Sequence, residues 1–276
     1  MHIIKKFIPN KEIYLIKKLK KKNVIKFYTK KQNKIILNEI SGYKYFNKIN
    51  IFKVPKLISF NKKARYLEIE YIPGYRTSFF DIKKIFLREG LSKKKTTIKN
   101  YLDLKCKNKK EENFLFIKDF FNTKNILKKK IYISKSHGDF ARYNIIKYDG
   151  NFYVIDFEKF GERIFSFDII NWYSHTIFYK ISKFIIFKNL KFSKNIFFSI
   201  ILNIIYFYIQ NRVTYFYKRK KILSNQKFKI YFILYLFEKI KMISEDIKFI
   251  TSTKEKKEIK KFILLLNEIL RRSVEK

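Results

Sequence analysis

Cysteine, proline and glycine are all rare in this chain of 276 residues, which contains one, three and six of them respectively. The single cysteine, Cys106, excludes a disulfide framework, and we expect a protein of the reducing cytoplasm. Neither G-x-x-x-x-G-K-S/T nor G-x-G-x-x-G occurs, which excludes a Walker-type phosphate loop and a glycine-rich phosphate clamp.

Acidic residues are also scarce, because 23 Asp and Glu stand against 64 Lys and Arg, for a formal net charge of +41. Such a charge could attract nucleic acid. However, the abundant residue types Lys, Ile, Asn, Phe and Tyr all have A/T-rich codons, and the lysines are spread along the whole chain. We therefore attribute the charge to a biased genome and expect no nucleic-acid partner, while peripheral contact with an anionic membrane stays open.

Long apolar runs are missing as well. The most apolar one, NIFFSIILNIIYFYI at 195–209, has 15 residues and contains Asn203, whereas a spanning helix needs about 20 apolar residues. We therefore expect a buried core helix here and no transmembrane segment. The N-terminal segment also lacks the apolar core of a secretory signal.

The first 72 residues predict a small antiparallel sheet with one helix. Apolar residues recur every three to four positions over 34–49, which predicts the helix, although Gly42 should weaken it slightly. Pro73-Gly74 should end the last strand. The predicted strands are 12–19, 23–30 and 66–72.

From about residue 77 the periodicity is mostly helical, and the polar segment 92–113 is predicted to be a helical insertion or a surface loop. Long aromatic-rich helices should follow residue 166. The predicted fold class is therefore α+β with two lobes. The smaller N-terminal lobe would comprise residues 1–72 and the larger, mainly helical lobe residues 73–276.

Four of the scarce acids lie in the segment SHGDFARYNIIKYDGNFYVIDFE, residues 136–158. Within it, Asp149-Gly150-Asn151 predicts a hairpin turn between two strands. A three-residue loop centred on Gly150 would place Asn144 opposite Asp156, with Cβ atoms about 5 Å apart. A two-residue turn would shift this pairing by one residue.

Side chains at the open end of this hairpin suit phosphoryl transfer. Asn144 and Asp156 offer hard oxygen atoms of the kind that bind Mg²⁺, and Asp139 lies five residues before Asn144. A carboxylate can then accept the proton of an attacking hydroxyl while metal ions neutralise the phosphates. Each residue alone also fits a turn, a cap or a strand end, so the inference depends on their joint spacing.

Two motifs in this segment resemble a known family. HGDF at 137–140, followed by Asn144, resembles the H-x-D-x-x-x-x-N catalytic loop of the protein-kinase-like fold, and VIDFE at 154–158 resembles its metal-binding Asp motif. HGD and the later FSFDII are more similar to the aminoglycoside phosphotransferase and choline kinase family than to protein kinases. Within that family, the branch associated with surface-polysaccharide or lipopolysaccharide synthesis is the most similar.

The resemblance implies a two-lobed protein-kinase-like fold and an ATP- and Mg²⁺-dependent transfer of phosphate to an alcohol group. It implies that Asp139 is the catalytic base and that Asn144 and Asp156 bind magnesium. His137 would pack the catalytic loop, and Asp168 would hold that loop through backbone hydrogen bonds.

The same resemblance calls for a strand lysine that pairs with a helix glutamate and reaches the α- and β-phosphates. Lys26 lies in a predicted strand and is our candidate, with Lys30 and Lys34 as alternatives because lysine is so common. Glu39 is better supported as the partner, since it lies on the predicted helix and is the only acid among residues 13–67.

Adenine is implied to bind main-chain atoms of Glu70 and Ile72 in the strand and hinge YLEIEYIPG, and the connection at 17–23 is the candidate cover for the phosphates. His175 is expected to be structural. Further pocket candidates are Arg142, which could contact a substrate anion, and Glu158, Arg163 and Trp172.

The predicted acceptor is a hydroxyl of a small molecule, a sugar or cell-envelope saccharide, and the positive charge favours an anionic one. Two alternatives stay open from the sequence. A choline or aminoglycoside-type kinase shares the family, although a chain with only 23 acids suits a polycationic aminoglycoside poorly. A kinase-like binding protein without catalysis would explain the missing glycine clamp.

Overall fold

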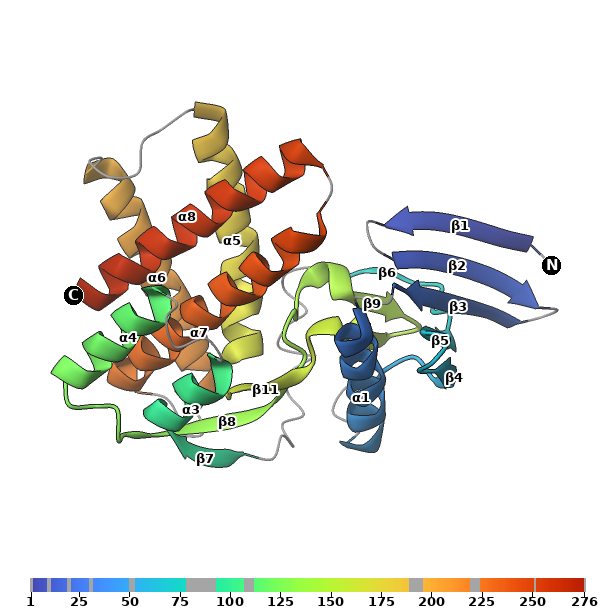
Figure 1. The fold of residues 1–276 in the computed structure, drawn as a ribbon, viewed down its shortest axis with the longest axis horizontal. Coiled ribbons are helices and arrows are strands. Elements are labelled where there is room, and N and C mark those ends of the chain that lie inside the picture. Colours follow the sequence, from blue (N-terminus) through green and yellow to red (C-terminus); the bar gives the residue numbers. More distant parts are fainter. Residues whose placement is uncertain are drawn as a thin grey trace. The chain divides into compact units, whose positions relative to one another are not determined.

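The computed structural model forms two compact units. Unit 1 consists of Met1–Ser92 and Ser134–Arg163, and unit 2 of Lys93–Ile133 and Ile164–Lys276. Figure 1 shows the elements of each unit. The residues that the structure describes are 2–8, 11–18, 21–29, 32–49, 53–77, 93–106, 112–188, 196–218, 224–250 and 252–275.

Unit 1 is built on a five-stranded antiparallel sheet with the order β1-β2-β3-β5-β4 (Figure 1). Three of its strands confirm the predicted ones, whereas β1 and β4 were missed. Lys18 pairs with Lys21, so the connection proposed to cover the phosphates is largely part of a β-hairpin. The strands are β1 (His2–Ile8), β2 (Lys11–Lys18), β3 (Lys21–Tyr28), β4 (Leu57–Asn61) and β5 (Tyr66–Glu70).

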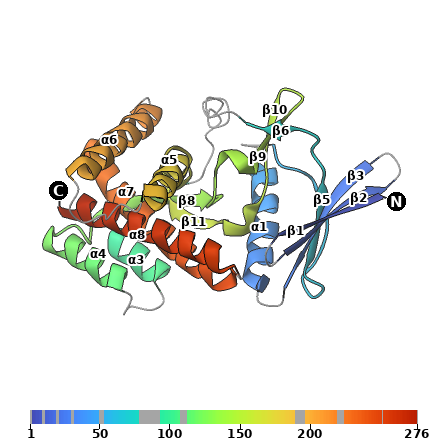
Figure 2. The same ribbon diagram turned by 90° about the horizontal axis from the view of Figure 1, so that it is seen from above.

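Helix α1 (Asn33–Ile49) confirms the predicted helix and packs against β4 and β5 (Figure 2). Its buried apolar side chains recur at the three- and four-residue spacing that places them on one face of a helix. These side chains are Ile36, Ile40, Tyr43 and Phe46.

A hairpin of β9 and β10 corrects the predicted register. Tyr148 pairs with Asn151, so the turn has two residues, Asp149 and Gly150, whose φ angles are 46° and 68°. Positive φ at both positions is the type I′ geometry that matches the twist of the flanking strands. The prediction that Asn144 lies opposite Asp156 is therefore wrong. Instead the Ile155 N–H donates to the Asn144 carbonyl at 2.9 Å.

The remaining elements of unit 1 surround this hairpin. β9 lies between β10 and β6 in a three-stranded sheet, and short 3₁₀ turns precede and follow the hairpin. These elements are β6 (Tyr75–Arg76), η3 (Arg142–Asn144), β9 (Ile145–Tyr148), β10 (Asn151–Val154) and η4 (Phe157–Lys159). The chain passes between the units within β8 (Lys130–Ser136) and β11 (Gly161–Ile164).

Unit 2 is mainly helical. Helix α7 is buried at every position from 231 to 240, which makes it the central helix of the unit. The segment predicted as an insertion or a surface loop contains β7 and α3, and its Ile98, Tyr101 and Leu102 are buried, so the surface-loop alternative is wrong for this part. The elements are β7 (Lys94–Thr97), α3 (Ile98–Lys105), α4 (Glu112–Thr123), α5 (Phe167–Lys188), α6 (Ile196–Lys218), α7 (Asn225–Asp246), η5 (Ile247–Phe249) and α8 (Thr253–Glu275).

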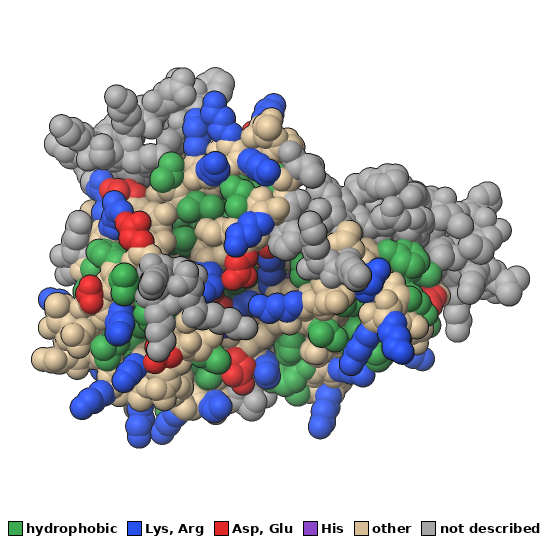
Figure 3. Space-filling view, in the orientation of Figure 1, with side chains coloured by type: hydrophobic (Ala, Val, Ile, Leu, Met, Phe, Trp, Pro, Cys, Tyr) green, Lys and Arg blue, Asp and Glu red, His purple; other side chains and the backbone are tan. Residues whose placement is uncertain are grey.

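Helix α6 contains the most apolar run of the sequence and buries Leu202, Ile209 and Val213. Among the helices in the described ranges, none combines the length and the apolar character needed to cross a membrane. Lys and Arg side chains are scattered over the face shown in Figure 3, with Asp and Glu among them, as the even spread of lysine along the sequence predicts.

Candidate active site

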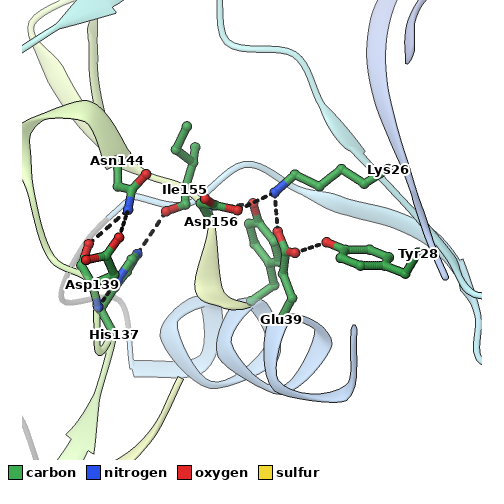
Figure 4. A network of polar contacts seen from close by, with 9 residues as sticks. Lys26, Tyr28, Glu39, His137, Asp139, Asn144, Ile155 and Asp156 are labelled. Atoms are coloured by element: carbon green, nitrogen blue, oxygen red, sulfur yellow. Dashed lines mark hydrogen bonds and ion pairs between the residues drawn. The ribbon is translucent and has the colours of Figure 1, made fainter. Parts of the chain in front are cut away.

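Lys26, on β3, is buried and contacts two carboxylates from distant parts of the chain (Figure 4). Its Nζ lies 2.5 Å from Oε1 of Glu39 on α1 and 2.7 Å from Oδ1 of Asp156. Three residues singled out in the sequence therefore meet at one point. Of the alternative lysines, Lys34 is exposed on α1, and Lys30 lies outside the described residues.

The electrostatics of this cluster favour a charged lysine between two carboxylates. Burial lowers the pKa of Lys26, but Asp156 and Glu39 together outweigh it and hold that pKa well above its usual value. The Tyr28 hydroxyl donates to the second oxygen of Glu39. Burial also raises the pKa of Tyr28 and of the adjacent Tyr43, so both hydroxyls stay protonated.

The aromatic ring of Phe157 joins α1 to the segment that carries Asp156. Phe157 is fully buried and packs on Tyr43 and Phe46, with ring centroids 4.8 and 5.1 Å away. A Cβ added at Gly42 would lie 2.4 Å from the Phe157 Cβ, far closer than real contacts. The glycine that weakens the predicted helix is therefore what allows α1 to approach Phe157.

Gly42→Ala is expected to destabilise unit 1 by about 1–3 kcal/mol, because overpacking outweighs the gain in helix propensity. The neighbouring Ser41→Ala is the matched control, since Ser41 is exposed on the same helix. Its unfolding free energy should change little. Chemical denaturation of both variants checks this, and a Gly42→Ala protein as stable as the native one would contradict the packing argument.

Asp156 reaches Lys26 through an unusual backbone conformation. Its φ and ψ are 68° and 63°, in the left-handed region that few residues other than glycine adopt. This turn leads the chain into η4, where Asn38 of α1 donates to the Glu158 carbonyl at 3.1 Å. Such strain persists where surrounding contacts enforce it, and it clusters at functional sites.

His137 connects the HGDF loop to the segment before Asp156. The ring is fully buried, its Nε2 lies 2.8 Å from the Ile155 carbonyl, and its Nδ1 accepts the Asp139 N–H at 3.2 Å. Because Nδ1 accepts, the proton lies on Nε2, which donates to the carbonyl. A neutral His137 thus holds both segments in one arrangement.

Asp139 has its carboxylate oriented by two neighbours in the same loop. Its Oδ2 accepts from the Tyr143 hydroxyl at 2.8 Å and from the Asn144 Nδ2 at 3.2 Å. The same Nδ2 donates to the Asp139 carbonyl at 2.9 Å. In Figure 4 the amide oxygen of Asn144 consequently points away from Asp139. Gly138 has φ 83°, and a Cβ there would lie 2.2 Å from the Lys159 carbonyl.

Oxygen atoms suited to a divalent cation gather beside Lys26. One carboxylate oxygen from each of Glu39, Asp156 and Glu158 lies within 4.8 Å of the others. These three carboxylates supply the hard oxygen atoms that Mg²⁺ prefers. Glu158, whose part the sequence left unresolved, therefore belongs to this group of carboxylates.

Three further predicted residues, Glu70, Ile72 and Arg163, lie outside the Lys26 cluster. Glu70 ends β5 and its N–H donates to the Lys56 carbonyl, while the Ile72 carbonyl accepts from Gly74, both at 2.9 Å. Only the Glu70 carbonyl and the Ile72 N–H therefore stay candidates for adenine. Arg163 is buried and donates to the Lys159 carbonyl at 2.5 Å.

Three candidates belong to unit 2. Asp168 lies in the first turn of α5, and Trp172 is buried on the same helix. His175 also lies on α5 and is partly buried. The tyrosines of the site, by contrast, were missed by sequence reasoning. Tyr28 and Tyr143 donate to the carboxylates of Glu39 and Asp139, and the Tyr43 hydroxyl accepts from the Asp156 N–H at 3.5 Å. The chain contains 20 tyrosines, so neither scarcity nor spacing distinguished these three in the sequence.

Comparison with known proteins defines the class of fold. No family model matches the sequence, and no curated protein matches it. Solved structures do match: the chain has the protein-kinase-like fold of the aminoglycoside phosphotransferase and choline kinase group, which confirms the predicted two-lobed α+β class.

Three of these structures illustrate the likeness. Choline kinase LicA from Streptococcus pneumoniae is 12% identical and matches over 94% of this chain and 89% of its own, with a TM-score of 0.55. The aminoglycoside phosphotransferase APH(4)-Ia is 9% identical over 98% and 93%, with a TM-score of 0.56. The amicoumacin kinase hAmiN, in complex with AMP-PNP, Ca²⁺ and Ami, is 11% identical over 98% and 88%, with a TM-score of 0.50.

Proposed function

We propose that this chain is an ATP- and Mg²⁺-dependent phosphotransferase that transfers the γ-phosphate to a hydroxyl of a small molecule. The observation that carries the proposal is the buried contact of Lys26 with Glu39 and Asp156. Kinases hold nucleotide phosphates with a strand lysine fixed by a helix glutamate, beside a metal-binding aspartate. The choline kinase and the aminoglycoside phosphotransferase named above support the same class of reaction.

On the nucleotide side, Lys26 would contact the α- and β-phosphates while Glu39 keeps its ammonium in place. The Glu70 carbonyl and the Ile72 N–H would bind the adenine edge. These assignments make residues 1–72 the nucleotide-binding lobe and residues 73–276 the catalytic and acceptor-binding lobe.

Magnesium would be held by the Asn144 amide oxygen and the Asp156 carboxylate. The residues fit the ion, because the Asn144 nitrogen is committed to Asp139 and the carboxylates beside Lys26 supply further oxygen atoms. When bound, Mg²⁺ neutralises charge on the phosphates.

Asp139 would accept the proton of the acceptor hydroxyl. The acceptor oxygen forms a bond to the γ-phosphorus, the bond from that phosphorus to the β–γ bridging oxygen breaks, and the proton passes to the Asp139 carboxylate. Tyr143 and Asn144 would keep this carboxylate in one orientation, and His137 would keep the loop in place. Asp168 would brace the loop from the start of α5.

The proposed acceptor is a sugar or cell-envelope saccharide in the cytoplasm. A choline or aminoglycoside-type kinase is the alternative that the named neighbours support. A kinase-like binding protein without catalysis is less well supported, because Asp139, Asn144 and Asp156 are all present and each contacts other residues of the site.

A thermal shift with ATP and Mg²⁺, followed by ATP turnover with candidate sugars, tests the proposal. We expect the nucleotide and metal together to raise the Tm. Asp156→Asn should weaken this binding at least about tenfold. A loss of that size in metal affinity is already typical when a residue that hydrogen-bonds to a metal ligand is replaced. Unfolding without nucleotide must be measured in parallel, since Asp156 also contacts Lys26.

The outcomes separate the alternatives. Native protein that neither binds Mg–ATP nor turns it over would rule out the enzyme. Binding without turnover on any acceptor would favour the binding protein, and turnover on choline or an aminoglycoside would identify the second alternative.

A further inference from the structure

Arg142 is anchored in the loop that carries Asp139. It is the first residue of η3, three positions after Asp139, and its Nε donates to the Thr77 carbonyl at 3.2 Å. Thr77 is 1% exposed, and its N–H donates to the Ile145 carbonyl at 3.3 Å. A buried residue directly after β6 therefore holds one nitrogen of the guanidinium of Arg142, which is an exposed residue.

The charge of Arg142 has no counterpart in the described part of the chain. No carboxylate there pairs with it, whereas Arg271 and Arg272 on α8 each contact a glutamate. The elements around it, β6, η3 and β9, contain no Asp or Glu. With Nε committed, the two terminal nitrogens form the flat fork that matches a carboxylate or phosphate group.

The position of Arg142 relates it to the acceptor. Its neighbour Tyr143 donates to the Asp139 carboxylate, so the backbone of η3 is fixed to the proposed base. An acceptor whose hydroxyl contacts Asp139 must lie beside this short loop. The anchored guanidinium of Arg142 can therefore bind a second functional group of the acceptor whose hydroxyl contacts Asp139.

We propose that Arg142 binds an anionic group of the acceptor and thereby selects acidic or phosphorylated saccharides over neutral ones. This rests on the proposed phosphotransferase function and names its substrate class. The same fork could bind a nucleotide phosphate, and the two sources are distinguished by which KM responds to a substitution.

Matched pairs of neutral and acidic sugars test the proposal, with glucose against glucuronate and glucose 1-phosphate, and galactose against galacturonate. The native protein should show a higher kcat/KM for the anionic members. Arg142→Gln should lower this preference about 10- to 100-fold, the value of a hydrogen bond to a charged group, without changing the KM for ATP. Arg142→Lys should be intermediate, because it keeps the charge but not the fork.

Lys63→Gln is the control, since it removes one charge from the exposed turn between β4 and β5. An unchanged preference in Arg142→Gln, a preference of the native protein for neutral sugars, or a raised KM for ATP would each overturn the proposal. If no sugar is turned over, the thermal shift of protein loaded with Mg–AMP-PNP decides. Anionic sugars must then raise the Tm more than neutral ones, and equal shifts overturn the acceptor site while leaving nucleotide binding intact.

Discussion

Asp139→Asn is expected to lower the turnover number about 10²- to 10⁴-fold, the range typical of a lost general base. Asparagine has the same shape as aspartate, and its side-chain oxygen can still accept from Tyr143 and Asn144. The loop should therefore keep its arrangement while losing the group that takes the proton. Single-turnover kinetics with Mg–ATP and a working acceptor measure the effect.

Asp149→Asn is the matched control, because Asp149 is an exposed turn residue with φ 46°, a conformation that asparagine also adopts readily. It should retain full turnover. Nucleotide binding should be unchanged in both variants. If Asp139→Asn kept more than a tenth of the native rate, another group would have to accept the proton.

Glu39→Gln should produce the largest loss of stability among single substitutions at the site. Glu39 is fully buried, with one oxygen on Lys26 and the other on the Tyr28 hydroxyl. Removing one partner of a buried ion pair costs about 3–5 kcal/mol, and we expect the lower end because Asp156 still contacts Lys26. The displaced ammonium should also weaken Mg–ATP binding.

The surface pair of Glu112 with Arg271 offers a control of the same chemistry. The two side chains lie 3.4 Å apart and are largely exposed, so Glu112→Gln should leave the unfolding free energy unchanged. Equal unfolding curves for Glu39→Gln and Glu112→Gln would show that the Lys26 cluster contributes no more than a surface pair.

The contribution of Glu39 should also depend on pH in one direction. Because the pKa of Lys26 is higher in the folded than in the unfolded state, its stabilising effect is fully present below the unfolded value of about 10.5 and is lost as the pH rises through the folded value. Tyr28, whose pKa is also raised, acts in the same direction. The difference in unfolding free energy between native protein and Glu39→Gln should therefore be equal at pH 7 and 9 and smaller above about 10.5. A decline between pH 7 and 9 would contradict an origin in the titration of Lys26 and Tyr28.

Local patterns predicted most of the elements around the site. Helix α1 followed from its periodicity, and β3 and β5 followed from alternation and the Pro73-Gly74 stop. Glu39 could be selected because it is an isolated acid on that helix. The strands β1 and β4 were not predicted. They are identified as strands only by their pairing with β2 and β5 in the sheet.

The hairpin shows where such patterns stop being sufficient. Asp149-Gly150 was recognised as a turn, but its length depends on the φ angles of both residues, and a change of one residue shifts every cross-strand pair. The segments that carry Asn144 and Asp156 still lie side by side. Three features bring their segments together: the Ile155 N–H bond to the Asn144 carbonyl, the His137 bond to the Ile155 carbonyl and the left-handed backbone of Asp156.

By itself, the sequence determined which residues are candidates for the chemistry, because HGDF with Asn144, VIDFE and the lone Glu39 are statements of residue type and spacing. Only the tertiary structure decided how Lys26 and Asp156, separated by 130 positions, come within 2.7 Å. That contact requires α1 to pack against Phe157, which Gly42 permits because it has no side chain. Packing between distant segments depends on shape in three dimensions, which periodicity and spacing along a chain do not describe.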